Sequence, residues 1–138
     1  MPPSNLHVRV PASAARLTQS IEPVRAFLQA HKIDGRTARD ILFCVHESCA
    51  NAIKHGGSDE DVDVRVSLAE GAVHLFIADR GRGLDLNRYD PHRQPSLAKS
   101  GGRGLYVMAC LMDDIEISLD GGTEIRMVKR LPPRVDTP

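Results

Sequence analysis

The sequence lacks several features that would point to particular functions. It has no tryptophan, and aromatic residues make up only 4% of its 138 residues, so a platform for stacking nucleic-acid bases is not expected. Its 18 Lys+Arg balance 18 Asp+Glu, which does not favour direct binding to nucleic acid or to an anionic membrane. No apolar run is long enough to span a bilayer, and residues 1–5 lack the pattern of a signal peptide. We therefore expect a cytoplasmic protein.

Patterns for disulfides, zinc and a phosphate-binding P-loop are also missing. The three cysteines, Cys44, Cys49 and Cys110, cannot pair completely and form no C-x-x-C, so we expect reduced and partly buried thiols. The run His46-Glu47 begins like a zinc-protease helix, but position 50 is alanine where the second histidine would stand. The motif G-x-x-x-x-G-K-[ST] does not occur.

The length of 138 residues and the hydrophobic content of 41% suffice for one domain with a single core. Apolar residues at helical spacing predict helices at 13–31, 37–55 and 105–112. Alternating patterns predict strands at 6–10, 62–68, 73–79, 115–119 and 125–127. We expect residues 1–138 to form one domain, with an ordered core over about 6–131 and a frayed tail at 132–138.

The order of these elements predicts the fold class. Strands joined by short hairpins cannot form an all-parallel sheet. We therefore predict an α+β two-layer sandwich, in which helices cover one face of a mixed, mainly antiparallel sheet. Pro23 is expected to kink or restart the first helix, with Ser20 as a possible cap. Residues 80–104 have almost no periodicity, which favours a lid or a binding loop.

One motif lies on the predicted helix 37–55. Glu47, Asn51 and His55 follow one another at four-residue spacing, so the first two project in nearly the same direction. A carboxylate and a carboxamide one turn apart are a natural general base and a natural magnesium ligand, because the amide oxygen is a hard donor. For these residues alone, a solvated helix face would be the better interpretation.

Two glycine motifs follow. Asp79-x-Gly81-x-Gly83 begins where a predicted strand ends, and a carboxylate there can accept a hydrogen bond from an exocyclic amine such as that of adenine. The alternative is an ordinary D-x-G turn. Gly101, Gly102 and Gly104 precede a predicted helix, where glycines expose backbone N–H groups to an anion. Alone, this second motif is a weak signal.

Taken together and in this order, the motifs resemble those of the GHKL ATPase superfamily, which has the Bergerat fold. The run V-H-E-S-C-A-N-A-I-K-H-G at 45–56 is similar to its N box, and Asp79-x-Gly81-x-Gly83 to its G1 box. Gly102-x-Gly104-Leu105 and Gly122-Thr123-Glu124-Ile125 are similar to its later glycine box and its closing element. The resemblance covers about residues 6–131.

Within that superfamily, the chain resembles bacterial anti-sigma factor serine-protein kinases. Three features carry this likeness: the N-box pattern E-x-x-x-N-A-x-x-H-G, a short lid at 84–100, and the run from Gly104-Leu105 to Leu111-Met112-Asp113. A complete sensor histidine kinase is not expected, because no helix with a phosphorylatable histidine precedes the domain.

The resemblance implies ATP and Mg²⁺ as cofactors and assigns roles to residues. Glu47 would be the general base, and Asn51 would hold Mg²⁺ against the phosphates. Asp79 would bind the adenine amine, supported by Thr123, above a floor shaped by Gly81 and Gly83. The remaining predicted contacts to the nucleotide are Lys54, His55, Gly101, Gly102, Gly104 and Leu105, with Lys99 and Arg103 as candidates for the γ-phosphate.

The resemblance also implies a function and partners. Such a kinase phosphorylates an anti-anti-sigma factor of the STAS type on serine or threonine, sequesters a sigma factor, and is usually a homodimer. Arg16 on the first helix would then lie on the partner surface, although a solvated charge is an equal alternative. Two other functions stay open: a nucleotide-binding switch without kinase activity, and a partner-switching kinase whose output is not a sigma factor.

Overall fold

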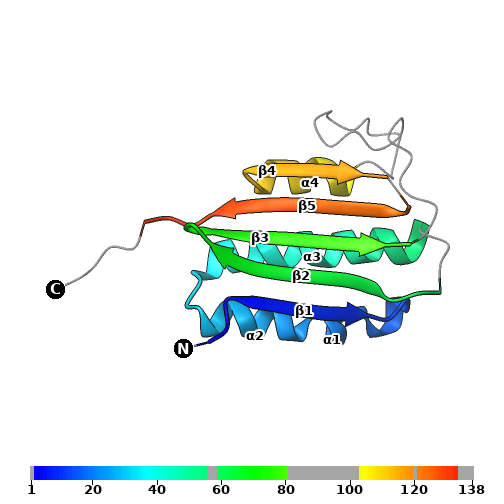
Figure 1. Ribbon diagram of the computed structural model, residues 1–138, viewed down its shortest axis with the longest axis horizontal. Helices are drawn as coiled ribbons and strands as arrows, with labels where there is room; N and C mark the ends of the chain where they lie inside the picture. Colours follow the sequence, from blue (N-terminus) through cyan, green and yellow to red (C-terminus); the bar gives the residue numbers. More distant parts are fainter. Residues whose placement is uncertain (1, 56–58, 81–102, 120, 134–138) are drawn as a thin grey trace.

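The computed structural model describes residues 2–55, 59–80, 103–119 and 121–133. It contains a five-stranded sheet in the order β1-β2-β3-β5-β4. The strands are β1 (Asn5–Val10), β2 (Val62–Ala69), β3 (Ala72–Asp79), β4 (Asp114–Ser118) and β5 (Thr123–Arg130). The helices are η1 (Ala14–Arg16), α1 (Leu17–Ser20), α2 (Glu22–Ala30), α3 (Gly35–His55) and α4 (Arg103–Leu111). These helices lie together behind the sheet in Figure 1, which confirms the predicted two-layer α+β fold.

The sheet differs from the prediction in one respect. Every pairing between described strands is antiparallel, so the described sheet contains no parallel pair and is not mixed. Strands β3 and β4 do run in the same direction, as expected for strands joined through the helix α4. However, β5 lies between them and pairs antiparallel with both.

The first predicted helix is broken near Ile21 into α1 and α2. Pro23 stands in the first turn of α2, where its missing N–H costs no hydrogen bond, so the prediction of a restart is confirmed. The prediction that Ser20 is a cap is wrong. Ile21 is the N-cap of α2, and the Ser20 hydroxyl instead donates a hydrogen bond of 2.7 Å to the carbonyl of Arg16.

Helix α3 begins after a capping carboxylate and runs beneath the centre of the sheet (Figure 1). The Asp34 carboxylate accepts a hydrogen bond of 3.1 Å from the backbone N–H of Thr37, which would otherwise have no partner in the helix. Hydrogen bonds from Thr37 also lower the pKa of Asp34. The helix that carries the predicted apolar face therefore has a defined N-terminus.

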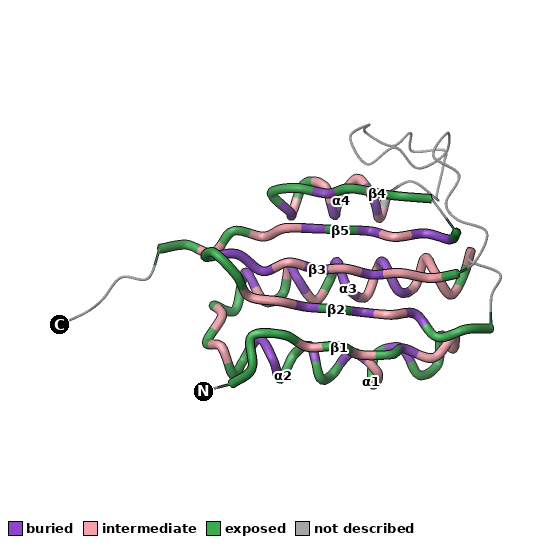
Figure 2. The backbone as a smooth tube through the Cα atoms, in the orientation of Figure 1, coloured by how far each residue is buried: buried purple, intermediate pink, exposed green. Residues whose placement is uncertain are grey.

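The core lies between the helices and one face of the sheet. Buried residues alternate with more exposed ones along most of β2 and β3 (Figure 2), so one face of each strand is buried. Cys44 and Cys49 of α3 are fully buried, and burial raises the pKa of each thiol to about 12. Cys110 is exposed, and all three cysteines are free, so the expectation of reduced, partly buried thiols is confirmed. No helix in the described ranges is both long and apolar enough to cross a membrane.

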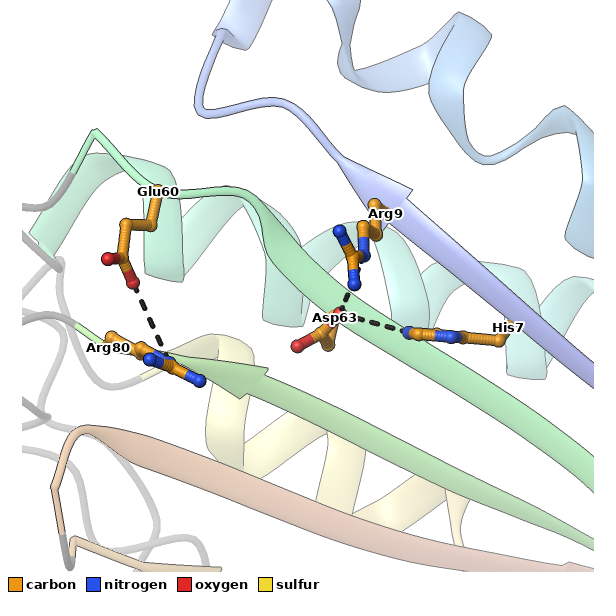
Figure 3. A network of polar contacts seen from close by, with 5 residues as sticks. All are labelled: His7, Arg9, Glu60, Asp63 and Arg80. Carbon is orange, nitrogen blue, oxygen red and sulfur yellow. Dashed lines mark hydrogen bonds and ion pairs between the residues drawn. The ribbon is translucent and has the colours of Figure 1, made fainter.

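The opposite face of the sheet carries polar side chains. Phe76 lies at its centre, with the guanidinium groups of Arg65 and Arg126 at 5.7 and 4.7 Å from its ring centroid. Around it is a hollow of about 710 Å³. Figure 3 shows Asp63 of β2 beside His7 and Arg9 of β1. Its Oδ1 lies 3.0 Å from Nε2 of His7 and 3.8 Å from Nε of Arg9. Such exposed pairs contribute about 0–1 kcal/mol each.

Candidate functional site

The C-terminal half of α3 carries the first predicted site residues. Glu47, Asn51 and His55 occur on successive turns and are half-buried, while Lys54 is exposed. Residues four apart on a helix are neighbours, so the carboxylate of Glu47 and the amide of Asn51 lie on the same side of α3. The helix predicted at 37–55 is thus confirmed, and it carries all three residues.

The start of α4 lies against Glu47. A Cβ atom built on Gly104 would overlap Oε1 of Glu47 and would lie 2.8 Å from both Cδ and Cγ of the same side chain. The carboxylate therefore occupies the space beside the first turn of α4. A helix N-terminus carries partial positive charge from its unpaired N–H groups, which favours an anionic carboxylate there. Two motifs that lie far apart in the sequence are thus brought into contact.

A buried contact fixes α4 in this position. The hydroxyl of Ser48, the residue after Glu47, donates a hydrogen bond of 3.2 Å to the sulfur of Met108 on α4. Both side chains are buried. At the other end of α4, Nζ of Lys129 donates a 2.6 Å hydrogen bond to the carbonyl of Leu111, where a cation complements the helix dipole. The helix that carries Gly104 is therefore held at its middle and at its C-terminus.

Asp79 and Thr123 are paired across two central strands. Asp79 ends β3, Thr123 begins β5, and the two are direct partners in the strand register. Thr123 is only 4% exposed, while Asp79 is half-buried. The predicted association of Asp79 with Thr123 is therefore consistent with the fold, because the antiparallel pairing of β3 and β5 places them side by side.

Gly122 makes this pairing possible, and the sequence analysis did not single it out as a site residue. Its φ of +137° lies in a region that side chains with a Cβ rarely adopt. A Cβ there would overlap the carbonyl oxygen of Asp79 and lie 2.9 Å from Cα of Arg80. Gly122 thus lets the turn before β5 lie directly on the end of β3. The signal in the sequence was the resemblance of Gly122-Thr123-Glu124-Ile125 to the closing element, which gave Gly122 no role of its own.

All these groups gather at one end of the sheet. The C-terminus of α3, the end of β3, the start of β5 and the N-terminus of α4 meet at the right-hand end of the sheet in Figure 1. The hollow around Phe76 lies on the opposite face of the sheet from α3, so it is separate from this site. In the described ranges, no group of three or more His, Cys, Asp and Glu could hold a metal ion.

Part of the predicted site lies outside the described residues. Gly81, Gly83, Lys99, Gly101 and Gly102 lie outside the described residues, as does most of the predicted lid. Arg103 begins α4, but its side chain is not described. The side chain of Leu105 is fully buried in the core. Leu105 can therefore reach a ligand only through its backbone, because its side chain packs among apolar neighbours.

The described residues fit a nucleotide with a metal ion. The N-terminus of α4 presents backbone N–H groups of its first turn, which are a favourable place for phosphate groups. The amide oxygen of Asn51, one turn from Glu47, is a hard oxygen donor of the kind that Mg²⁺ accepts together with phosphate oxygens. Asp79 and Thr123 supply polar atoms at the end of β3 that suit an exocyclic amine.

Comparisons with known proteins find relatives that are named as protein kinases. The chain is 31% identical over 102 residues to a serine-protein kinase RsbW of Bacillus velezensis, an alignment that covers 67% of this chain and 64% of that protein. It is 29% identical over 139 residues to a serine-protein kinase RsbW of Oceanobacillus iheyensis, covering 90% and 85%. The chain thus spans slightly less than two thirds of the length of the first relative.

Solved structures share the fold. The RsbU and RsbW domains of a Mycobacterium tuberculosis protein match with a TM-score of 0.71 at 24% identity, covering 96% of this chain and 34% of that one. The SiaB–SiaC complex of Pseudomonas aeruginosa matches with a TM-score of 0.62 at 16% identity, covering 89% and 88%.

A family assignment rests on most of the chain. The family described as the histidine kinase-like ATPase domain matches residues 10–129, which include the N box, Asp79, Gly104 and Thr123. This range also includes α1 to α4 and strands β2 to β5, apart from the last residue of β5. The chain therefore belongs to the histidine kinase-like ATPase family.

Proposed function

We propose that the protein is an ATP-dependent serine/threonine-protein kinase and anti-sigma factor of a bacterial partner-switching pathway. Its substrate would be an anti-anti-sigma factor with a STAS domain, and it would also bind a sigma factor. The observation that carries the proposal is the position of Glu47, one turn before Asn51 and directly against the N-terminus of α4. The similarity of the chain to proteins named serine-protein kinase supports the same reaction.

The roles of the residues follow from their positions. Asp79 would accept a hydrogen bond from the adenine amine, with Thr123 beside it on β5. The first turn of α4 would donate backbone N–H groups to the phosphates, and Asn51 would hold Mg²⁺. Lys54 and His55, on the last turn of α3, would lie near the phosphates. The bound ATP supplies the phosphoryl group, and the protein supplies positioning and neutralisation of charge.

Glu47 would act on the protein substrate. In the transfer, the serine or threonine oxygen forms a bond to the γ-phosphorus as the bond from that phosphorus to the bridging oxygen breaks, and ADP leaves. Glu47, which lies against the first turn of α4, would accept the proton that the hydroxyl loses. A carboxylate is ionised at neutral pH, so it can accept a proton.

The partners form the second half of the proposal. Arg16 is exposed at the end of η1, where it is accessible to a protein partner.

A homodimer is also proposed, and sedimentation equilibrium of the purified chain measures its mass directly. A purely monomeric mass at micromolar concentration would contradict it.

The function is tested by combining capture with phosphoryl transfer. The purified chain, loaded with ATP and Mg²⁺, is used to capture proteins from a native cell extract. The captured proteins are then purified and incubated with the chain and γ-labelled ATP. We expect a STAS-domain protein to carry the label on serine or threonine, and a sigma factor to be captured. ATP binding without transfer would instead indicate a nucleotide-binding switch. Transfer without any sigma factor would indicate a different output.

A further inference from the structure

The contact between Glu47 and Gly104 suggests a role for Gly104 beyond exposing backbone N–H groups. We propose that Gly104 is a positioning residue for the base: its missing side chain provides the space in which the Glu47 carboxylate is held against the first turn of α4. This inference rests on the proposed function, because it concerns the group that accepts the hydroxyl proton. It concerns the geometry of that group and not the binding of nucleotide.

The surroundings of Gly104 carry this inference. Apart from the flanking residues and the backbone of α4 itself, the three atoms nearest to a Cβ built on Gly104 are all side-chain atoms of Glu47, namely Oε1, Cδ and Cγ. No backbone atom is among these three nearest neighbours. The φ of Gly104 is also not in the positive range. An alanine at position 104 is therefore compatible with the local backbone, and the group that has to move is the carboxylate of Glu47.

Helix α4 cannot easily relieve this overlap by shifting. Leu105 and Met108, on the same helix, are fully buried in the core. Met108 also accepts the hydrogen bond from Ser48, the residue next to Glu47. Buried side chains in a closely packed core resist displacement. The flexible end of Glu47 is thus the cheapest group to move, and moving it takes the carboxylate away from the helix N-terminus.

The inference predicts that Gly104→Ala lowers the rate of phosphoryl transfer and leaves ATP binding largely intact. Gly104→Ala keeps the backbone N–H of residue 104, so its contribution to phosphate binding remains. The fold should remain as well, because alanine is a better helix former than glycine. The rate of transfer should fall, because a displacement of about 1 Å of a catalytic group can reduce a rate by roughly 10²-fold.

The test measures ATP affinity and transfer in Gly104→Ala. With γ-labelled ATP, Mg²⁺ and the STAS-domain substrate at saturation, we expect kcat to fall by about 10- to 100-fold. The dissociation constant for ATP should change by less than about threefold. Gly35→Ala is the matched control, because it adds the same methyl group at the start of α3 with no atom within 4 Å. Gly35→Ala should leave both properties unchanged.

A double-mutant cycle shows whether the effect passes through Glu47. Glu47→Asp shortens the side chain by one methylene and withdraws the carboxylate from Gly104. In the Glu47→Asp background, adding Gly104→Ala should therefore cost much less transfer activity than it costs in the wild-type background. An equal loss in both backgrounds would overturn the inference. A loss of ATP affinity as large as the loss of kcat would overturn it as well, because it would indicate a role in phosphate binding.

A measurement without catalysis separates this inference from the proposed function. The ¹³C resonance of the Glu47 side-chain carboxyl carbon reports its surroundings in the free protein. We expect this resonance to shift in Gly104→Ala and to stay in place in Gly35→Ala. An unchanged resonance in Gly104→Ala would overturn the positioning role even in a protein that transfers phosphate. Failure of the wild-type protein to transfer phosphate, with the resonance shifted as expected, would instead refute the kinase function.

Discussion

The two sides of α3 have different neighbours. One side packs against the sheet with residues such as Ile41 and Val45, both 0% exposed. The other side, near the C-terminus of the helix, presents the half-buried Glu47 and Asn51 at the end of the sheet, with Gly104 of α4 against Glu47. A single helix thus carries part of the core and part of the candidate site, and the two sets of residues lie on different sides of its axis. Substitutions on the two sides should therefore affect different measured properties.

Glu47→Gln should give the largest effect and should affect only chemistry. The amide keeps the size of the side chain but cannot accept the proton, so phosphoryl transfer should fall by about 10²–10⁴-fold. Because Glu47 is only half-buried, the free energy of unfolding should change little. Transfer of labelled phosphate and urea denaturation are measured on the same preparation.

Glu22→Gln is the matched control, since Glu22 is exposed on α2 and only pairs with Arg25 at 3.4 Å. It should leave transfer unchanged. If Glu47→Gln transfers phosphate at a rate near that of the wild type, Glu47 is not the base.

Ile41→Ala should have the opposite effect. Truncating a fully buried isoleucine removes apolar contacts and leaves a cavity, so the free energy of unfolding should fall by about 2–5 kcal/mol. The ATP affinity of the folded fraction should be unchanged. Urea denaturation and calorimetry measure the two quantities.

Phe43→Ala on the same helix is the control for Ile41→Ala, because Phe43 is 40% exposed. It should cost clearly less stability than Ile41→Ala. If both variants lost the same free energy of unfolding, the side of α3 that faces the sheet would not contribute more to stability than its exposed side.

Asp79→Asn should weaken ATP binding without affecting the core. The loss of a charged hydrogen-bond acceptor for the adenine amine should cost about 1.5–3 kcal/mol, roughly a 10- to 150-fold rise in the dissociation constant. Calorimetry with ATP and Mg²⁺ measures this. Asp63→Asn on the polar face of the sheet is the control, since Asp63 contacts His7 and Arg9 there. Similar affinities for the Asp79→Asn variant and the control would remove Asp79 from the adenine site.

The smallest effect concerns the cap of α3 and its pH dependence. Hydrogen bonds from Thr37 hold the pKa of Asp34 below its usual value. The resulting contribution to stability is present above the pKa of the unfolded state, near ~3.9, and is lost as pH falls through the lower pKa of the folded state. Asp34→Asn should therefore flatten the fall in stability below about pH 4. An unchanged acid profile in urea denaturation would show that the cap carries no such linkage.

The sequence predicts those parts of the fold whose pattern lies within one element or one hairpin. The apolar face of α3 and the hairpin of β2 and β3 follow from periodicity, because each pattern repeats within one element. The break at Ile21 does not follow from periodicity, since Leu17, Ile21, Val24 and Leu28 keep helical spacing across it, and Pro23 was the residue that indicated it. Sheet order was also out of reach, because hairpin patterns do not show which strands from distant segments pair.

The candidate site shows the same limit. The resemblance supplied roles for Glu47, Asp79 and Thr123, but not the contacts between them. Thr123 pairs with Asp79 only because β5 enters the sheet beside β3. Similarly, Gly104 meets Glu47 because Met108 and Leu105 seat α4 against α3 and the sheet. These contacts depend on packing between segments that are far apart along the chain.

The separation of site and core along α3 is tested most directly by titrating the isotope-labelled protein with ATP and Mg²⁺ and following its backbone amide resonances. We predict that the largest shifts occur at Glu47, Asn51, Asp79, Gly104 and Thr123. Thr37 and Ile41, near the start of α3, should shift little, as should Phe76 on the polar face of the sheet. Saturable shifts centred on Phe76, or no saturable shift at all, would contradict the account.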